Sequence, residues 1–392
     1  MLHPLRRSVN GAHHKLRKLF YVKDFVTLIR PYVFLMSVLG YFPYSVSLST
    51  YKSVKKNLAW SLIILIKITL LYSILLYKML SMDVMKDFSV RLHYSSIYIF
   101  GLVCFWTSYL SSRSKLHLLR MISTASRLLS PKTFHRTAKW MFAIDFLKIA
   151  VFLSYLFSIS RDPWAASFYL MSYFVFLVAL VMIMLFVNCL YVLNLCFCKI
   201  NTSLEKLRTS LVTDEPHLLR RVYHSQKNPT LLSELKTLRR QYLELAKIVD
   251  ASNDTFGLEM IVLIALTMMD ITFNLYTYLV LNTDDGKIVN LWSINIKYLA
   301  NNCQGLIFMA IVCEMVKDQA KNIAYNIHRI LVITFDEQIS TELALFSMQV
   351  LQQNHTIVAR GLVIDVTLLT KIVGIITTYL LILIQFLLTT PC

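Results

Sequence analysis

Close to the end of the chain, one long apolar run carries a stripe of polar and small side chains. The run extends from Gly361 to Leu388 and is long enough to cross the ~30 Å hydrocarbon core of a bilayer as a helix. A glutamine deep in such a run is costly unless it meets a protein partner or water. The stripe therefore predicts either hydrogen bonds to packed neighbouring helices or one wall of a water-filled path. At helical spacing its members are Lys371, Gly374, Thr378, Ile382, Gln385 and Thr389.

A second set of side chains combines aromatic rings with hydrogen-bonding groups toward one end of several other apolar runs. A pocket for a small molecule needs that mixture, with mostly apolar walls and a few directed polar groups. Aromatic residues at span ends are also ordinary interface anchors. Asp270 and Asn274 share a helical face and are the strongest ligand-binding candidates, because polar groups inside a membrane are expensive. The other candidates are Tyr94, Tyr98, Tyr169, Tyr173, Tyr278, Trp292, Tyr298 and Asn302.

The sequence has no motif that predicts an enzyme or a metal site. His-Glu-x-x-His, Gly-x-Ser-x-Gly and a phosphate-binding glycine loop are all missing. Cys196-x-Cys198 has the wrong spacing for zinc and no histidine nearby. We therefore expect no catalytic residue, no metal ligand and no cofactor.

The composition is that of a membrane protein. Of 392 residues, 56% are hydrophobic and only 16% are charged, whereas about a quarter are charged in soluble domains. The formal net charge of +18 lies in the loops, where lysine and arginine set the orientation and meet anionic lipid. No basic segment has interleaved aromatics, so we expect membrane lipid and not nucleic acid as a partner.

The apolar residues predict an all-α polytopic protein with seven transmembrane helices. The expected spans are Leu58–Leu80, His93–Leu110, Trp140–Ser160, Ala166–Cys198, Phe256–Leu281, Asn290–Val316 and Gly361–Leu388. We divide the chain into an N-terminal cytoplasmic segment with a short interfacial helix, Tyr32–Val46 (residues 1–57), spans one to six (58–316), and a cytoplasmic helix with the last span (317–392). The loops after spans two, four and six are the basic ones, which places the N-terminus in the cytoplasm and the C-terminus outside.

Two more features carry expectations, one outside the spans and one inside. Leu231, Leu235, Leu238, Tyr242, Leu245 and Val249 form a heptad seam in the charged segment after span four. We expect helices there to project into the cytoplasm and to hold subunits together. Asp145 and Lys148 lie three residues apart in span three and should neutralise each other.

The last span resembles that of the insect gustatory receptors. Thr378-Tyr379, five apolar residues and then Gln385-Phe386 near the C-terminus match the signature of that family, and the resemblance covers roughly residues 341 to 388. It implies a seven-span cation channel of the plasma membrane of sensory neurons, opened by a small-molecule tastant. It also implies four subunits, identical or mixed, around a pore lined by the last span. Gln385 and Phe386 would lie at the gate with Thr378 and Ile382 along the pore, and Tyr379 would pack the span against its neighbours.

The resemblance leaves the tastant open, and two other classes of protein have comparable spans. A bitter or other non-sugar compound is our preferred ligand, with a sugar or an internal nutrient as the alternative. A G-protein-coupled receptor has the opposite orientation and needs Asp/Glu-Arg-Tyr and Asn-Pro-x-x-Tyr motifs that this chain lacks. A secondary transporter is suggested by Lys67, Asp270 and Lys297, but no paired halves with broken helices are visible.

Overall fold

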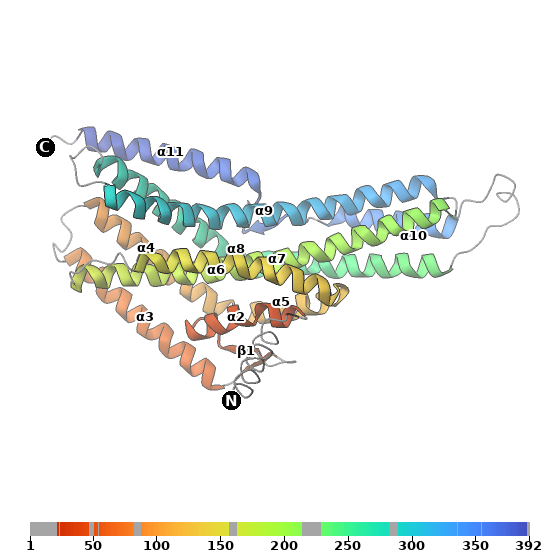
Figure 1. Cartoon of the computed structure of the whole chain (residues 1–392), viewed down its shortest axis with the longest axis horizontal. Coiled ribbons are helices and arrows are strands. Elements are labelled where there is room, and N and C mark those ends of the chain that lie inside the picture. The colour runs from red at the N-terminus through yellow and green to blue at the C-terminus, as the bar shows by residue number, and fades with distance from the viewer. Residues whose placement is uncertain are drawn as a thin grey trace, which may run out of the picture.

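The computed structural model describes residue 22 and residues 24–46, 51–53, 55–81, 88–156, 163–213, 229–281, 289–334, 336–353 and 355–389. This part of the chain is almost wholly helical, and several of its long helices run roughly along the longest axis of the molecule (Figure 1). The helices are α2 (Phe25–Val38), α3 (Lys55–Ser81), α4 (Phe88–Leu110), α5 (Ser112–Ala125), α6 (Pro131–Leu156), α7 (Pro163–Thr213), α8 (Pro229–Leu281), α9 (Val289–Ile333), α10 (Glu337–Gln352) and α11 (Val366–Thr389).

Two short antiparallel hairpins complete the described elements, together with a 3-10 turn over Ser126–Leu128. The first hairpin joins β1 (Tyr44–Val46) to β2 (Tyr51–Ser53). The second joins β3 (Val358–Ala359) to β4 (Leu362–Val363) directly before α11. The second hairpin occupies the beginning of the apolar run that we expected to be helical from Gly361. The reason is local, since Arg360 and Gly361 both have positive φ (47° and 98°) and form a tight two-residue turn.

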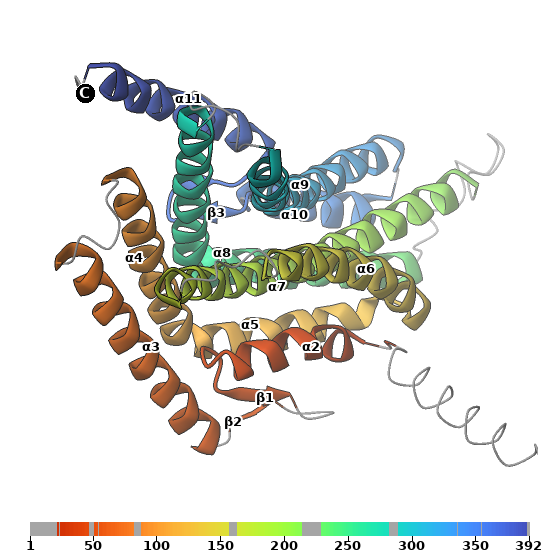
Figure 2. The same cartoon turned by 60° about the vertical axis from the view of Figure 1, so that its left-hand side comes forward.

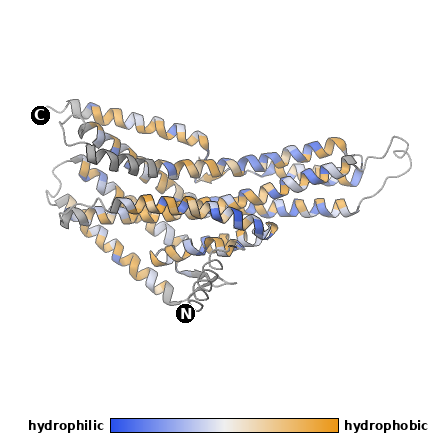
Figure 3. Ribbon diagram, in the orientation of Figure 1, coloured by the Kyte–Doolittle hydropathy of each residue, from blue (hydrophilic) through white to orange (hydrophobic). Residues whose placement is uncertain are grey.

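Four helical segments in the described part of the chain are long and apolar enough to cross a membrane. They are Leu58–Met79, Ser167–Leu211, Pro229–Leu279 and Val366–Gln385. The other expected spans also fall on helices: the second on α4, the third on α6 as far as Leu156, and the sixth on α9. The apolar residues gather in one half of the molecule and the hydrophilic ones in the other (Figure 3).

Helices α7, α8 and α9 are longer than a bilayer requires. α7 alone has 51 residues, which corresponds to about 77 Å at the α-helical rise. Beyond Cys198 its sequence becomes charged, and the hydrophilic ends of α7, α8 and α9 form a bundle with α10 at the end of the molecule opposite the C-terminus (Figures 1 and 3). These are the helical extensions that the sequence predicted.

The heptad seam has a different partner from the one we expected. Leu235, Leu238, Tyr242, Leu245 and Val249 are all buried inside the single chain. The ring of Tyr242 packs edge-on against Phe197 of α7 and Phe346 of α10, with centroids 6.3 and 5.4 Å apart. The expectation that this seam joins subunits was wrong, because a heptad pattern shows that a helix packs lengthwise but does not identify the partner helix.

Two short helices were missed or misplaced by the sequence. α5 lies within the basic stretch between spans two and three, with Leu116, Leu119 and Ile122 buried and its arginines exposed. α2 begins before the predicted interfacial helix because Asp24 forms a capping box with Thr27, and it ends at Val38, two residues before Gly40, where φ is +88°. The two helices lie side by side (Figure 2).

A buried polar cluster ties α2 to α6 and α7. The hydroxyl of Tyr32 donates to Asp145 Oδ2, which also accepts from Asn188 Nδ2 at 3.1 Å. Lys148 Nζ lies 3.8 Å from Asp145 Oδ1. The predicted neutralising pair is therefore present, but the closer contacts of Asp145 come from two side chains on other helices.

Candidate functional site

Helix α11 is attached to the rest of the chain by one narrow apolar stripe. Leu368, Ile372 and Ile376 follow one another at four-residue spacing and are buried, with 5%, 5% and 8% of their surface exposed. They face α8 and α9, the neighbours of α11 in Figures 1 and 2. The greater part of the surface of α11 is left uncovered by its own chain, which is unusual for a helix that carries polar residues in mid-span.

The polar stripe predicted from the sequence lies on this uncovered surface. Thr378, Ile382 and Gln385 are exposed, as are Lys371 and Gly374. The hydroxyl of Thr378 donates to the carbonyl oxygen of Gly374 at 2.9 Å and thus stays on its own helix.

Three further residues of α11 were also assigned roles from the sequence. Tyr379 is 58% exposed, so within its own chain it does not pack the span against a neighbour, and packing against another subunit stays a prediction. The side chains of Phe386 and Thr389 fall outside the described residues, although both belong to α11.

The N-terminal end of α11 is held by an ionic contact to α9. Asp365 precedes the helix and accepts from Leu368 N at 3.2 Å and from Thr367 Oγ1 at 2.6 Å. Lys317 Nζ of α9 lies 3.4 Å from Asp365 Oδ2 and 3.2 Å from Glu314 Oε1. The hydrogen bond from Thr367, and after it the lysine, lower the pKa of Asp365 below its ordinary value, although burial opposes them. A charged Asp365 therefore caps α11 and links it to α9.

Helix α8 clasps the hairpin that leads into α11. Asn253 Nδ2 donates to the carbonyl oxygen of Thr356 at 3.1 Å, and Asn253 Oδ1 accepts from Val358 N at 3.0 Å. One helical turn further on, Gly257 lies so close that an added Cβ would be 3.4 Å from Arg360 N. The backbone of the hairpin is thus fixed to one short segment of α8.

The same helix carries the strongest predicted ligand-binding residue. Asp270 is 1% exposed, and its Oδ1 lies 3.0 Å from Nε2 of His93 on α4. Asn274 donates to the carbonyl oxygen of Asp270 at 2.7 Å and so turns back onto its own helix. Rings surround the pair, since His93 lies between Phe273 and Tyr94, and Tyr94 meets Tyr169 edge-on.

The remaining predicted pocket residues divide into two groups. Tyr98 is fully buried, stacks on Tyr72 at 5.3 Å and donates to the carbonyl oxygen of Phe168, so it serves packing between helices. Tyr173 meets Phe152 edge-on at 6.2 Å. The side chains of Trp292, Tyr298 and Asn302 lie outside the described residues.

Sequence reasoning did not select His93 and Phe273. A carboxylate inside a span needs a partner, and His93 is the first residue of the predicted second span. A search for a partner of Asp270 among the polar residues of the other spans could therefore have found His93. Nothing in the sequence marked Phe273, because an aromatic residue among many apolar ones is ordinary.

A family comparison covers almost the whole chain. The family described as 7tm chemosensory receptors matches residues 29–390. The chain belongs to the 7tm chemosensory receptor family.

Two solved structures are similar to this chemosensory receptor. One is the insect olfactory receptor OR5 from Machilis hrabei, with a TM-score of 0.69, 11% sequence identity, and coverage of 91% of this chain and 97% of that one. The other is the same receptor in complex with eugenol, with a TM-score of 0.63 and the same identity and coverage. At this identity the likeness shows the fold alone. A search of curated proteins finds no match.

Membership of the family confirms several expectations at a coarser level. The protein is an all-α, multi-pass membrane receptor with the fold of the insect olfactory receptors, and its family is one of receptors and not of enzymes. The predicted resemblance to gustatory receptors holds at the level of the chemosensory family.

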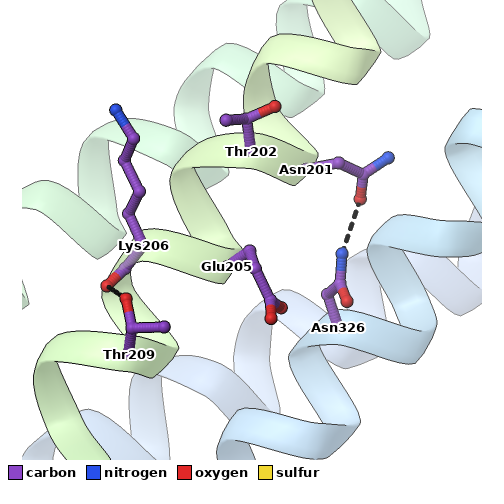
Figure 4. Close-up of a pocket in the computed structure, with 6 residues that line it drawn as sticks. All are labelled: Asn201, Thr202, Glu205, Lys206, Thr209 and Asn326. Atoms are coloured by element: carbon purple, nitrogen blue, oxygen red, sulfur yellow. Dashed lines mark hydrogen bonds between the residues drawn. The ribbon is translucent and has the colours of Figure 1, made fainter. Parts of the chain in front are cut away.

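A polar groove lies far from both candidate regions of this receptor, on the hydrophilic extensions of α7 and α9. It measures about 480 Å³ and is lined by Asn201, Thr202, Glu205, Lys206, Thr209 and Asn326. Figure 4 shows Asn326 donating to Asn201 across the groove, at 3.0 Å. Asn201 also donates to Gln319 Oε1 at 2.9 Å, so these amides hold α7 to α9. In the part of the chain that the structure describes, no three histidine, cysteine or acidic side chains form a metal-binding group.

Proposed function

We propose that this receptor is a ligand-gated cation channel of the plasma membrane of sensory neurons, in which α11 from four subunits surrounds one pore. The observation that carries the proposal is the uncovered polar stripe of Thr378, Ile382 and Gln385. An exposed glutamine on a span is costly in lipid, so the face that carries Gln385 is expected to lie against protein or water. A ring of identical subunits around an axis supplies both, with protein at the flanks of α11 and a water-filled path at the stripe.

We place the gate at the outer end of α11. Phe386 is turned by ~100° from Gln385 on an ideal helix, so the two side chains have different surroundings. A ring of Phe386 side chains would close the path by excluding water, while Gln385 would bond across subunits or contact the ions. Tyr379 would pack α11 against the next subunit, which its exposure in the single chain supports.

Helix α8 provides a physical link between the ligand and the gate. It carries Asp270 in the candidate ligand site and, thirteen residues earlier, Gly257 against the hairpin that begins α11. The separation is about 20 Å along the same helix. A ligand that binds one position of α8 more tightly than another would therefore bias the position of α11.

The proposed orientation has seven spans, with the N-terminus in the cytoplasm and the C-terminus outside. The bias of basic residues toward the loops after spans two, four and six supports it. An epitope placed after Cys392 should be stained on intact cells, and one placed before Met1 should require permeabilised cells. The reverse pattern would refute both the orientation and the channel proposal.

The ligand that we propose is a small tastant of the bitter or other non-sugar class. The candidate site supports this choice, because its described side chains offer one carboxylate among rings and apolar groups. A sugar presents many hydroxyl groups and needs correspondingly many directed polar partners. A sugar receptor or an internal nutrient receptor would be identified by ligand-evoked current with those compounds.

The channel proposal is tested by recording current from cells that express the receptor. Phe386→Ala should raise the basal current per surface-expressed receptor, since it removes an apolar constriction. Gln385→Ala should change ion selectivity, measured as reversal potentials in sodium and in a larger cation. Leu380→Ala, on the opposite side of α11, is the matched control and should leave both quantities unchanged. Unchanged basal current, selectivity and unitary conductance in both test variants would refute the assignment of the gate.

A further inference from the structure

We propose that Lys371 places a ring of positive charge at the cytoplasmic mouth of the pore and that this ring favours the passage of monovalent over divalent cations. The inference rests on the proposed function, since it names a selectivity residue of the same pore. Among the 24 residues of α11, Lys371 is the only one with a charged side chain, and that side chain is exposed. In a channel of four such subunits, one lysine becomes a ring of four.

The position of Lys371 around the helix is that of the polar stripe. On an ideal helix, Lys371 is turned by about 20° from Thr378 and from Ile382, both of which are exposed. The buried stripe that attaches α11 to α8 and α9 is centred on Ile372, about 100° away. Lys371 therefore points in the same direction as the residues that we assign to the pore, and away from the helices of its own chain.

The space beside Lys371 on this stripe is open. Gly374 follows it by three residues, and a Cβ added there would meet no atom within 4 Å. Side chains of an α-helix tilt toward its N-terminus, so the ammonium group of Lys371 extends toward the beginning of α11. Lys371 itself lies about 8 Å along the axis from Val366. In the proposed orientation this end is the cytoplasmic mouth of the pore.

The charge of Lys371 is not neutralised by a described carboxylate. The nearest acid in the sequence is Asp365, which accepts from Leu368 N at 3.2 Å and lies 3.4 Å from Lys317 Nζ, so it is already engaged. None of the ion pairs among the described residues includes Lys371. Four lysines on the pore face would therefore add their charges.

A ring of positive charge discriminates between cations by their valence. Repulsion lowers the local concentration of an ion by a Boltzmann factor, and the exponent for a divalent ion is twice that for a monovalent ion. If the ring lowers the concentration of sodium by a factor f, it lowers that of calcium by f squared. For four charges near the axis of a water-filled path at physiological salt, f is roughly 3. Calcium is then disfavoured relative to sodium by the same factor again.

A lysine near the end of a span has a second common role, which is to reach the lipid headgroups with its ammonium group. Lys67 provides the comparison for this role. It is an exposed lysine inside the apolar span of α3, on the opposite side of the molecule from α11 (Figures 1 and 2). Replacing a lysine that contacts only headgroups leaves ion permeation unchanged, so measurements of permeation separate the two roles.

The test records receptor-dependent current, basal or evoked by caffeine as a neutral bitter probe, from excised patches of cells that express the receptor. Lys371→Gln removes the charge, Lys371→Arg keeps it, and Lys67→Gln is the matched control. The ratio of calcium to sodium permeability, obtained from reversal potentials, should rise roughly threefold in Lys371→Gln. It should stay at the wild-type value in the other two variants. Equal ratios in the wild type and Lys371→Gln would overturn the proposal.

A second measurement needs only the wild type and decides the question if Lys371→Gln does not reach the surface. With equal sodium on both sides, depletion of cations at the cytoplasmic mouth makes the outward current smaller than the inward current at equal and opposite voltages. Salt screens the ring, so this asymmetry should shrink when sodium chloride is raised from about 0.05 M to about 0.5 M on both sides. Equal inward and outward currents at both concentrations would contradict the ring.

The same recordings distinguish this inference from the channel proposal. Receptor-dependent current whose calcium permeability is unaffected by Lys371→Gln leaves the channel standing and overturns the role of Lys371. Wild-type receptor at the cell surface that gives no current of its own contradicts the channel proposal, and this inference with it.

Discussion

The buried ion pair between Lys115 of α5 and Glu259 of α8 offers a quantitative test of how the helices are held together. Both side chains are 1% exposed, and Nζ lies 2.8 Å from Oε1. Ser111 donates to the same carboxylate oxygen, and Lys115 donates to Ser108. At an effective dielectric constant of about 20, the charges attract by about 6 kcal/mol, most of which is offset by their desolvation.

Removing one member leaves the other buried without its partner, which costs about 3–5 kcal/mol. We therefore expect Lys115→Met and Glu259→Gln each to lower the free energy of unfolding by about 3 kcal/mol. The double variant should lose at least about 2 kcal/mol less than the sum of the two, because no unpaired charge remains. Lys139→Met, at an exposed lysine of α6, is the control and should change stability by less than about 0.5 kcal/mol.

The assay is thermal unfolding of the purified receptor in detergent, with the wild type and the four variants at equal protein and detergent concentrations. The unfolding temperatures should fall clearly in both single variants and recover in part in the double variant. Strict additivity of the two single effects would show that the charges do not interact in solution, and the described contact between α5 and α8 would then be wrong.

Three further predictions follow from other contacts. Burial lowers the pKa of His355 below its ordinary value of 6.5, so the stability that the neutral imidazole contributes is complete above pH 6.5 and is lost as the pH falls toward the lowered pKa. His355→Gln should therefore flatten the dependence of unfolding temperature on pH below 6.5. An equal slope in the wild type and the variant would contradict this. Leu245→Asp places a charge in the intramolecular seam and should abolish folding of the subunit, measured as monodisperse yield, whereas Lys247→Asp at an exposed position should not. Gly257→Ala should fold normally, because its new Cβ would meet the hairpin at ordinary contact distances. Gly40→Ala should lower the unfolding temperature, because Gly40 has a positive φ and its added Cβ would approach Ile64 to 2.5 Å. Equal unfolding temperatures in the two variants would contradict this.

The features that follow from one helix alone could be predicted from the sequence. The polar stripe through Thr378, Ile382 and Gln385 depends only on helical periodicity, and it lies on one exposed face as expected. Asp270 was selected because a buried carboxylate is expensive, and the structure gives it a partner on another helix. The length of α7 beyond the bilayer could likewise be read from the position of its charged residues.

The features that depend on which helices are neighbours could not be predicted. The seam around Tyr242 was assigned to another subunit because periodicity does not distinguish a partner in the same chain from one in another. The hairpin interrupts an apolar run because Arg360 and Gly361 both adopt positive φ angles and form its turn. The role of Gly257 as a close contact of that hairpin depends on the approach of two segments far apart in the sequence.

The most direct test of the central claim, that α11 lines an ion path, is the accessibility of single cysteines to a charged, membrane-impermeant thiol reagent. Thr378→Cys and Ile382→Cys lie on the exposed stripe, whereas Ile376→Cys lies on the buried one and serves as the control. We predict that the reagent reduces ligand-evoked current irreversibly in the first two variants and leaves the control unchanged. An equal response of all three variants, or no response at the stripe positions while the channel is open, would contradict the claim.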